Sequence, residues 1–187
     1  LVFIVANSRY TTLLATATGT SDNSNVTDSS TNNHSVSVNG DVYAGTFSPY
    51  RSGGYSTYFD GSGDYLQLPS DAGFSFGTGD FTVECWVYYP PIPVTNTNGK
   101  MIIDSRPTSS NGSYWHLGSS PAGNIAFTTM TIGGNTIVDT VARPDQWVHY
   151  AVTRSGTSLR LFANGTLVAS TTDSSNISSA SPTIGKN

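Results

Sequence analysis

The segment Phe76-Gly-Thr-Gly-Asp-Phe-Thr-Val-Glu-Cys-Trp-Val-Tyr88 decides the fold of this chain. In its second half apolar side chains occupy alternate positions, which is the period of a strand with one face in a protein core. The side chains predicted to face the core are those of Phe81, Val83, Cys85 and Val87. Those predicted to face away from it are Thr82, Glu84, Trp86 and Tyr88.

Short segments with strand-like patterns recur along the 187-residue chain, separated by clusters of Gly, Ser, Asn and Pro. A tight turn is predicted at Asn39-Gly40, and hairpins are predicted around residues 60–63, 155–156 and 164–165. No segment shows a convincing helical period. The sequence therefore predicts an all-β fold, a jelly-roll β-sandwich of two antiparallel sheets.

The amino-acid composition argues against several classes of protein for this chain. Charged residues make up 11% of the chain, well below the usual quarter, and typical helix formers are scarce, which disfavours helical bundles. The eight Lys and Arg residues are scattered, so we expect no nucleic acid partner, because strong phosphate binding needs a positive stripe. No apolar stretch reaches the roughly 18 residues of a membrane span, so no membrane span is predicted.

Cysteine and histidine offer little chemistry. Cys85 is the only cysteine, so the chain can form no internal disulfide and no thiolate zinc site. Its place in the alternating segment predicts a core side chain rather than a reactive thiol. The three histidines are His34, His116 and His149, too far apart in sequence to form a zinc motif.

Three stretches of the chain resemble one known superfamily. They are Tyr58-Phe-Asp-Gly-Ser-Gly-Asp-Tyr-Leu66, the segment from Phe76 to Tyr88, and residues 147–165. They resemble the laminin-G-like, concanavalin A-like lectin/glucanase superfamily. The opening, with Leu13-Leu14 and Asp28-Ser-Ser-Thr-Asn-Asn-His34, resembles the variant common in bacteriophage virion proteins. The resemblance covers about residues 10 to 185 and implies the jelly-roll sandwich, but this fold serves many functions.

The resemblance suggests how the chain divides. Residues 1–9 are expected to be an N-terminal strand or the end of an upstream segment, and residues 10–187 the laminin-G-like domain. Members of the family usually continue beyond the part like residues 181–185 with a loop and a last strand. We therefore expect either that the sequence is truncated here, or that the sandwich is completed by residues 1–6 or by another chain. Residues 1–6 are apolar on both faces, which favours pairing with a sheet edge in the same domain or in a neighbouring subunit.

Catalysis is not expected. Glycoside hydrolysis ordinarily needs two carboxylates about 5 to 10 Å apart. Enzymes of this fold resemble one another in a strand that carries two Glu and an Asp, whereas this chain has one Glu, Glu84, whose strand contains no other acid. The sequence therefore predicts a non-enzymatic domain.

Calcium is the metal that deserves a test, because related laminin-G domains often carry it and loop carboxylates suit it. Candidate ligands would be Asp60, Asp64, Asp71 and Asp80, which lie at predicted turns. A turn role, in which the side chain bonds to nearby backbone, is the favoured interpretation for all four. No cofactor is predicted and no metal ligand is assigned.

Alternation along three strands predicts a binding face. If residues 81–88, 147–154 and 158–163 share a sheet, its outer, concave face carries Trp86, His149 and Phe162, with Glu84, Tyr88 and Arg160 around them. Aromatic rings beside polar groups suit sugars, whose C–H faces stack on π systems. The alternative is that loops such as residues 90–99 cover this face and make it a second small core.

The first hypothesis for function is a non-enzymatic virion structural module, in a phage tail, fibre or capsid surface, with glycan adhesion as an added role. Its expected location is the virion surface, and its expected partners are other virion subunits or copies of itself, with a host-surface glycan. The alternative is a secreted or cell-surface bacterial carbohydrate-binding module, which would be extracellular.

Overall fold

The fold is built from two antiparallel sheets and two short strand pairs. A computed structural model describes residues 10–17, 26–49, 53–91, 99–106, 113–120, 122–130, 136–179 and 181–186. The larger sheet runs in the order β11 (Thr136–Val138), β10 (Ile125–Met130), β9 (Tyr114–Ser119), β8 (Met101–Asp104), β15 (Thr183–Ile184), β6 (Tyr65–Gln67) and β3 (Ser37–Asn39). The smaller sheet runs β14 (Thr166–Thr172), β13 (Ser158–Ala163), β12 (Trp147–Ser155) and β7 (Phe81–Tyr88). The pairs are β1 (Ala15–Ala17) with β2 (Val26–Asp28), and β4 (Tyr43–Gly45) with β5 (Ser56–Tyr58).

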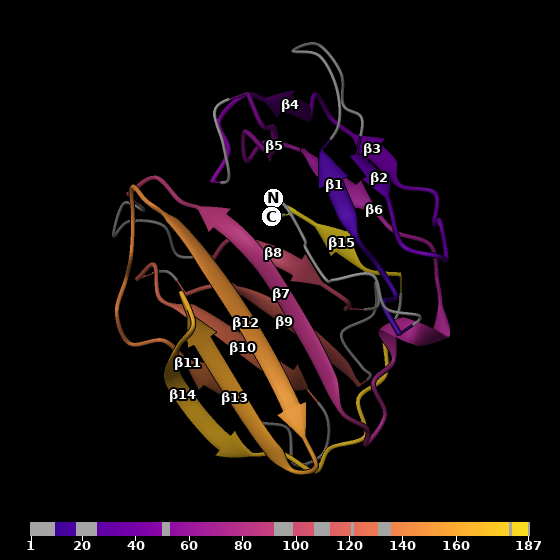
Figure 1. The fold of residues 1–187 in the computed structure, drawn as a ribbon, viewed down its shortest axis with the longest axis vertical. Helices are drawn as coiled ribbons and strands as arrows, with labels where there is room; N and C mark the ends of the chain where they lie inside the picture. Colours follow the sequence, from indigo (N-terminus) through magenta and orange to yellow (C-terminus); the bar gives the residue numbers. More distant parts are fainter. Residues whose placement is uncertain are drawn as a thin grey trace.

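The two sheets lie face to face, and Figure 1 shows the smaller sheet in front of strands β8 to β11 of the larger one. The short pairs and strands β3 and β6 gather at one end of this sandwich. The predicted all-β sandwich of two antiparallel sheets is confirmed. In the described part of the chain the one helix is a single 3₁₀ turn, η1 (Ala72–Phe74), and no helix there is long and apolar enough to cross a membrane.

Strand β7 has the predicted orientation. Val83, Cys85 and Val87 are all buried, and the core that they enter includes Trp115 and Phe127 of the larger sheet. Burial raises the pKa of the Cys85 thiol to about 12, so this group is neutral at ordinary pH and acts as a small core side chain. The interpretation of Cys85 as core filler is confirmed.

Two predicted hairpins form and connect three strands of the smaller sheet. The β12–β13 turn passes through Gly156, with φ of 58°, and the β13–β14 turn passes through Asn164 and Gly165, with φ of 49° and 77°. Left-handed backbone of this kind is what tight hairpins require, and Gly and Asn supply it at low cost.

The hairpin predicted around residues 60–63 is wrong. Strand β6, which follows these residues, pairs with β3, whereas β5, which precedes them, pairs with β4. Asn39-Gly40 likewise separates strands that belong to different sheets, although Gly40 has the expected turn conformation with φ of 78°. Residues 37–45 and 56–67 therefore run side by side as one antiparallel ribbon that turns a corner out of the larger sheet.

The last described strand also departs from expectation. Thr183 and Ile184 of β15 pair with β6 on one side and β8 on the other, so β15 lies inside the larger sheet and leaves no open edge there. In the described residues it is the smaller sheet that ends at a long strand, β7. The strand expected within residues 1–9 lies outside the described residues.

One end of the sandwich is built around a buried cation. Arg154, on β12, has a side chain with no exposed surface. Its guanidinium donates hydrogen bonds to the carbonyls of Gly77 and Gly79 before β7 and to the carbonyl of Ser175 after β14, at 2.7 to 3.0 Å. It also donates to Asp173 at 3.2 Å. Five N–H groups in a rigid fork make arginine suited to binding several acceptors at once.

Asp173 carries this connection into the opposite sheet. Its carboxylate accepts a hydrogen bond of 2.7 Å from the hydroxyl of Thr129 on β10 and one of 2.9 Å from the backbone N–H of Ser175. Burial by itself would raise the pKa of Asp173, but the hydrogen bonds from Ser175 and Thr129 and the charge of Arg154 bring it below its ordinary value. Asp173 is therefore ionised, and together with Arg154 it links β12, β10 and two loops.

Replacing Arg154 by methionine is expected to destabilise the domain by about 3 to 5 kcal/mol, because it leaves the Asp173 carboxylate and several carbonyls buried without their donor. The matched control is Arg160→Met on the neighbouring strand, where the side chain is exposed and the change should stay within about 0.5 kcal/mol. Urea unfolding followed by tryptophan fluorescence measures both. Equal losses for the two variants would show that Arg154 is not a structural centre.

Candidate functional site

The outer face of the smaller sheet carries a compact group of three side chains. Trp86 on β7 lies directly opposite His149 on β12, and their rings are 5.3 Å apart between centroids. Glu84, two residues before Trp86, places a carboxylate oxygen 3.5 Å from Nε2 of His149. The side chains of His149 and Glu84 are 27% and 21% exposed, so solvent reaches both.

Ala151 is the smallest side chain beside this group. It lies opposite Glu84 on one side and Phe162 on the other, so the row across the sheet reads Glu84, Ala151, Phe162. Adjacent strands lie about 4.8 Å apart, which places Glu84 and Phe162 roughly 10 Å from each other with only a methyl group between them. The next row in the same direction holds Thr153 and the exposed Arg160.

A second aromatic group continues the face toward the other end of β7. Tyr88 lies opposite Trp147, and Phe47, from the loop after β4, contacts both rings at centroid distances of 4.8 and 5.3 Å. Phe47 is itself 55% exposed. The hydroxyl of Tyr88 lies 3.5 Å from a carboxylate oxygen of Asp145. Among the described residues, Nε1 of Trp147 is buried without a hydrogen-bond acceptor.

The structure brings together most of the predicted binding residues. Glu84, Trp86 and His149 form one group, Tyr88 lies at one end of it, and Phe162 and Arg160 lie in successive rows on the next strand over. Sequence reasoning did not include Trp147, although it shares the orientation of His149. Phe47 could not be found in this way, because only the folded chain places its loop over β7 and β12. The covering loop considered as an alternative falls mostly in residues 92–98, outside the described residues.

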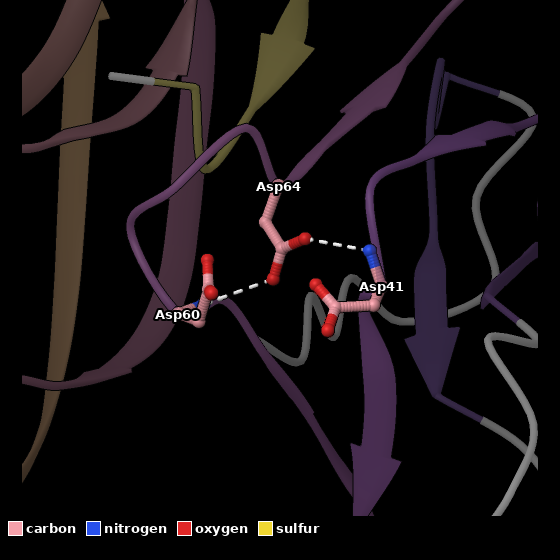
Figure 2. Close-up of side chains that lie close together, drawn as sticks. All are labelled: Asp41, Asp60 and Asp64. Atoms are coloured by element: carbon pink, nitrogen blue, oxygen red, sulfur yellow. Dashed lines mark hydrogen bonds between the residues drawn. The ribbon is translucent and has the colours of Figure 1, made fainter.

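The turn carboxylates form the one group of three metal-ligand side chains in the described residues. Figure 2 shows Asp41, Asp60 and Asp64 at the corner of the ribbon, and their carboxylate oxygens lie within 4.8 Å of one another. Asp64 is buried, and its two oxygens accept the backbone N–H groups of Asp41 and Asp60 at 2.8 and 2.9 Å. These bonds lie where the pairing of the ribbon is interrupted, between the pair Asn39–Tyr65 and the pair Tyr43–Tyr58.

The other turn carboxylates act in the same way. Asp71 accepts the N–H of Gly73, and Asp80 accepts the N–H of Gly156, both at 2.7 Å. Asp71 therefore has the predicted turn role, as does Asp60, which accepts the N–H of Ser62 at 2.6 Å, whereas Asp80 binds the turn of another hairpin, the one between β12 and β13.

The segment from Asp28 to His34, which helped to suggest a family, is also a backbone clamp. Asp28 is buried and accepts the backbone N–H groups of Leu14, Ser30 and His34, all at 2.9 Å. Burial would raise the pKa of Asp28, but these donors outweigh it and lower the pKa to about 2. The imidazole of His34 lies 2.7 Å from the same carboxylate. This part of the motif is structural.

The comparisons with known proteins agree with this architecture. A laminin-G family model, described as concanavalin A-like lectin/glucanases superfamily, matches residues 60–187. The chain belongs to the concanavalin A-like lectin/glucanase superfamily. The resemblance seen in the sequence is confirmed at that level, and the finer likeness to phage virion domains stays a prediction. No curated protein is significantly similar to the chain in sequence.

Solved structures of other members of this fold are distant in sequence. The receptor-binding domain of botulinum neurotoxin D superposes with a TM-score of 0.69 at 18% identity, over 88% of this chain and 43% of that one. A neurotoxin type C structure, described through its interaction with two ganglioside molecules, gives 0.61 at 17% identity, over 89% and 41%. The binding domain of neurotoxin DC in complex with SialylT gives 0.67 at 16% identity, over 93% and 42%.

These likenesses show the fold and no more. The chain spans about four tenths of the length of the neurotoxin domains, so what the whole domains bind is not thereby a property of this lectin-like domain.

The position of Asp64 at the corner leaves no room for a side chain at residue 40. A Cβ at Gly40 would come within 2.2 Å of an oxygen of Asp64, whereas one at Gly63, also at positive φ, would meet nothing within 4 Å. Gly63→Ala should cost about 1 to 2 kcal/mol for the left-handed backbone alone. Gly40→Ala should cost a further 1 to 3 kcal/mol or so, because Asp64 must move. Thermal unfolding compares the two, and equal losses would contradict the clamp.

Proposed function

We propose that this domain is a non-catalytic carbohydrate-binding module that holds its ligand on the outer face of the smaller sheet. The observation that carries the proposal is the group of Trp86, His149 and Glu84 beside the small side chain of Ala151. The group combines an aromatic surface, a hydrogen-bonding imidazole and a carboxylate, and all three remain partly accessible to solvent.

Each part of this group has a counterpart in a sugar ring. The axial C–H groups of a pyranose make an apolar surface that packs on an indole, which favours a ring over Trp86. Glu84 can accept hydrogen bonds from one or two hydroxyls, and charged acceptors give stronger bonds than neutral ones. Only the methyl group of Ala151 separates Glu84 from Phe162 on this face, and Phe47, Tyr88 and Trp147 offer a second apolar surface for a longer chain.

The family supports this reading, since its description joins lectins with glucanases. Two of the superposed neurotoxin structures are described with a ganglioside interaction or in complex with SialylT, although those statements concern proteins more than twice as long as the matched region. They support sugar binding in general and point to no particular glycan.

Lack of catalysis is part of the proposal, because the superfamily also includes glucanases. The strands β7, β12, β13 and β14 carry a single carboxylate, Glu84. The imidazole of His149 lies 3.5 Å from it across the strands, and Ala151 occupies the position directly opposite. A hydrolase needs a second carboxyl group across the glycosidic bond, either as the nucleophile or to activate water.

We place the module outside the cell, on a secreted or cell-surface protein, where glycans are available. The assignment to a virion surface rests on the sequence resemblance alone, and none of the structures named above is a virion protein.

A glycan array followed by calorimetry on the best ligand tests the proposal. Trp86→Ala should weaken binding at least about tenfold, which corresponds to 1.4 kcal/mol, because the stacking surface is lost. The matched control is Tyr114→Ala, which removes a half-buried aromatic residue from the larger sheet, where Tyr114 stacks on His116 at 6.0 Å. It should bind as the parent does. Absence of any glycan ligand, or equal binding by Trp86→Ala and the parent, would overturn the assignment.

Glu84→Gln separates binding from hydrolysis. It keeps the shape of the side chain but removes its charge, so we expect weaker binding and no change in products, since the parent should release none. Reducing-end assays on a panel of polysaccharides measure this. Cleavage by the purified parent that disappears in Glu84→Gln would make the domain a glycosidase.

A further inference from the structure

The strand pair β4–β5 carries two exposed tyrosines, at the end of the sandwich toward which the arrow of β7 points (Figure 1). Tyr43 lies directly opposite Tyr58, and the centroids of their rings are 5.0 Å apart. The two residues are 44% and 51% exposed, whereas Ala44 and Thr57, on the other face of the pair, are buried. Single exposed apolar side chains are ordinary on a protein surface, but aromatic rings exposed side by side indicate a binding surface.

The two tyrosines lie on the same face of the ribbon as Phe47. A Cβ at Gly45 would lie 3.7 Å from the ring of Tyr43, so this ring extends along the ribbon in the direction of Phe47. Ser56 shares the orientation of Tyr58, because side chains two residues apart on a strand point the same way. The hydroxyl of Ser56 donates a hydrogen bond to the carbonyl of Phe47. Phe47 therefore continues the face that the two tyrosines begin.

These tyrosines and the outer face of the smaller sheet together form one aromatic track, which consists of Trp86, Tyr88, Trp147, Phe47, Tyr43 and Tyr58. Phe47 joins its two halves, because its ring contacts both Tyr88 and Trp147. Trp86 lies two residues before Tyr88 on the same face of β7, a step of about 7 Å. Four residues of chain lead from Tyr43 to Phe47 and span at most ~14 Å. The aromatic track is therefore long enough for several sugar rings in a row.

Carboxylates border the aromatic track along its length. Glu84 lies at one end, and Asp145 lies near the middle, where its carboxylate is 3.5 Å from a tyrosine hydroxyl. Asp41 and Asp60 lie at the ribbon corner, each two residues from one of the paired tyrosines (Figure 2). In the described part of the chain no lysine or arginine forms an ion pair with any of the four. Carboxylates accept hydrogen bonds from hydroxyl groups and repel other carboxylates, so this border favours a ligand rich in hydroxyls and free of acidic groups.

We propose that the ligand of this domain is a neutral, linear polysaccharide, bound along its length with successive rings on the aromatic track. This assignment rests on the glycan binding proposed above and specifies its ligand class. A glycan recognised through one terminal sugar would contact the residues around Trp86 and would not reach Tyr43 and Tyr58. Each further ring that packs on an aromatic side chain adds to the binding free energy, so affinity should rise with chain length until the track is occupied.

Calorimetry with fragments of cellulose, laminarin, mannan and xylan, from disaccharide to hexasaccharide, tests this assignment. In the series that binds, the hexasaccharide should bind at least about tenfold more tightly than the disaccharide. Tyr43→Ala should weaken hexasaccharide binding at least about threefold and leave disaccharide binding unchanged, because only the longer chain reaches the tyrosines. Tyr43→Phe, the matched control, keeps the ring and should bind both ligands as the parent does. Polygalacturonate, a linear acidic chain, should not bind.

A second variant keeps the test decisive if the first does not fold. Tyr58→Ala removes the other ring of the pair and should cause the same selective loss of hexasaccharide binding, with thermal unfolding to confirm that each variant is folded. Equal affinity of the parent for disaccharide and hexasaccharide, or full hexasaccharide binding by the folded alanine variants, would overturn the aromatic track and leave a glycan site at Trp86.

The remaining outcomes separate this inference from the proposed function. Tighter binding of polygalacturonate than of the neutral chains would contradict the ligand class, as would an array ligand held through a terminal sugar while none of the four series binds. Self-association of the parent that both alanine variants abolish would assign the tyrosines to a contact between two copies. Only the absence of any glycan ligand would overturn the proposed function as well.

Discussion

Arg154 places a full positive charge inside the protein, at the end of the sandwich where β12, the approach to β7 and the segment after β14 meet. A buried charge is tolerated only where its hydrogen-bonding capacity is used, and here carbonyls from two loops and the Asp173 carboxylate use it. The cost of burying the guanidinium is thus offset only when both loops adopt their native course. This requirement fixes how β7 enters the sheet and therefore which of its faces points into the core.

The same constraint positions the side chains on the outer face of the smaller sheet. Its side chains alternate with core residues on β7 and β12, so Val83, Cys85 and Val152 hold the strands whose opposite faces carry Glu84, Trp86 and His149. Sites on paired strands are positioned more accurately than sites on loops. Phe47 is the exception, because it reaches the face from a loop and its position depends on the ribbon corner at Asp64.

The sequence predicted what depends on local pattern. The alternation along β7, the hairpins at Gly156 and Asn164, and the grouping of Trp86 with His149 all follow from a strand period of two and from residues that accept left-handed backbone. Prediction from the sequence was wrong where the structure depends on which strands pair with each other. A turn signal at residues 60–63 indicates a sharp bend but not which segments pair, so the sequence predicts a hairpin where the structure has a corner. The contact of Phe47 with Trp147, separated by 100 residues, has no local signal at all.

The burial of Cys85 has a practical consequence for work on this protein. Its thiol is inaccessible and its pKa is raised to about 12, so alkylating reagents meet no reactive sulfur while the sandwich is closed. A cysteine introduced on the surface would be the single labelling position of the folded chain, with no need to remove the native one. Conversely, the rate at which a thiol reagent modifies Cys85 would measure how often the two sheets separate. The native cysteine would then serve as a probe of the opening of the sandwich.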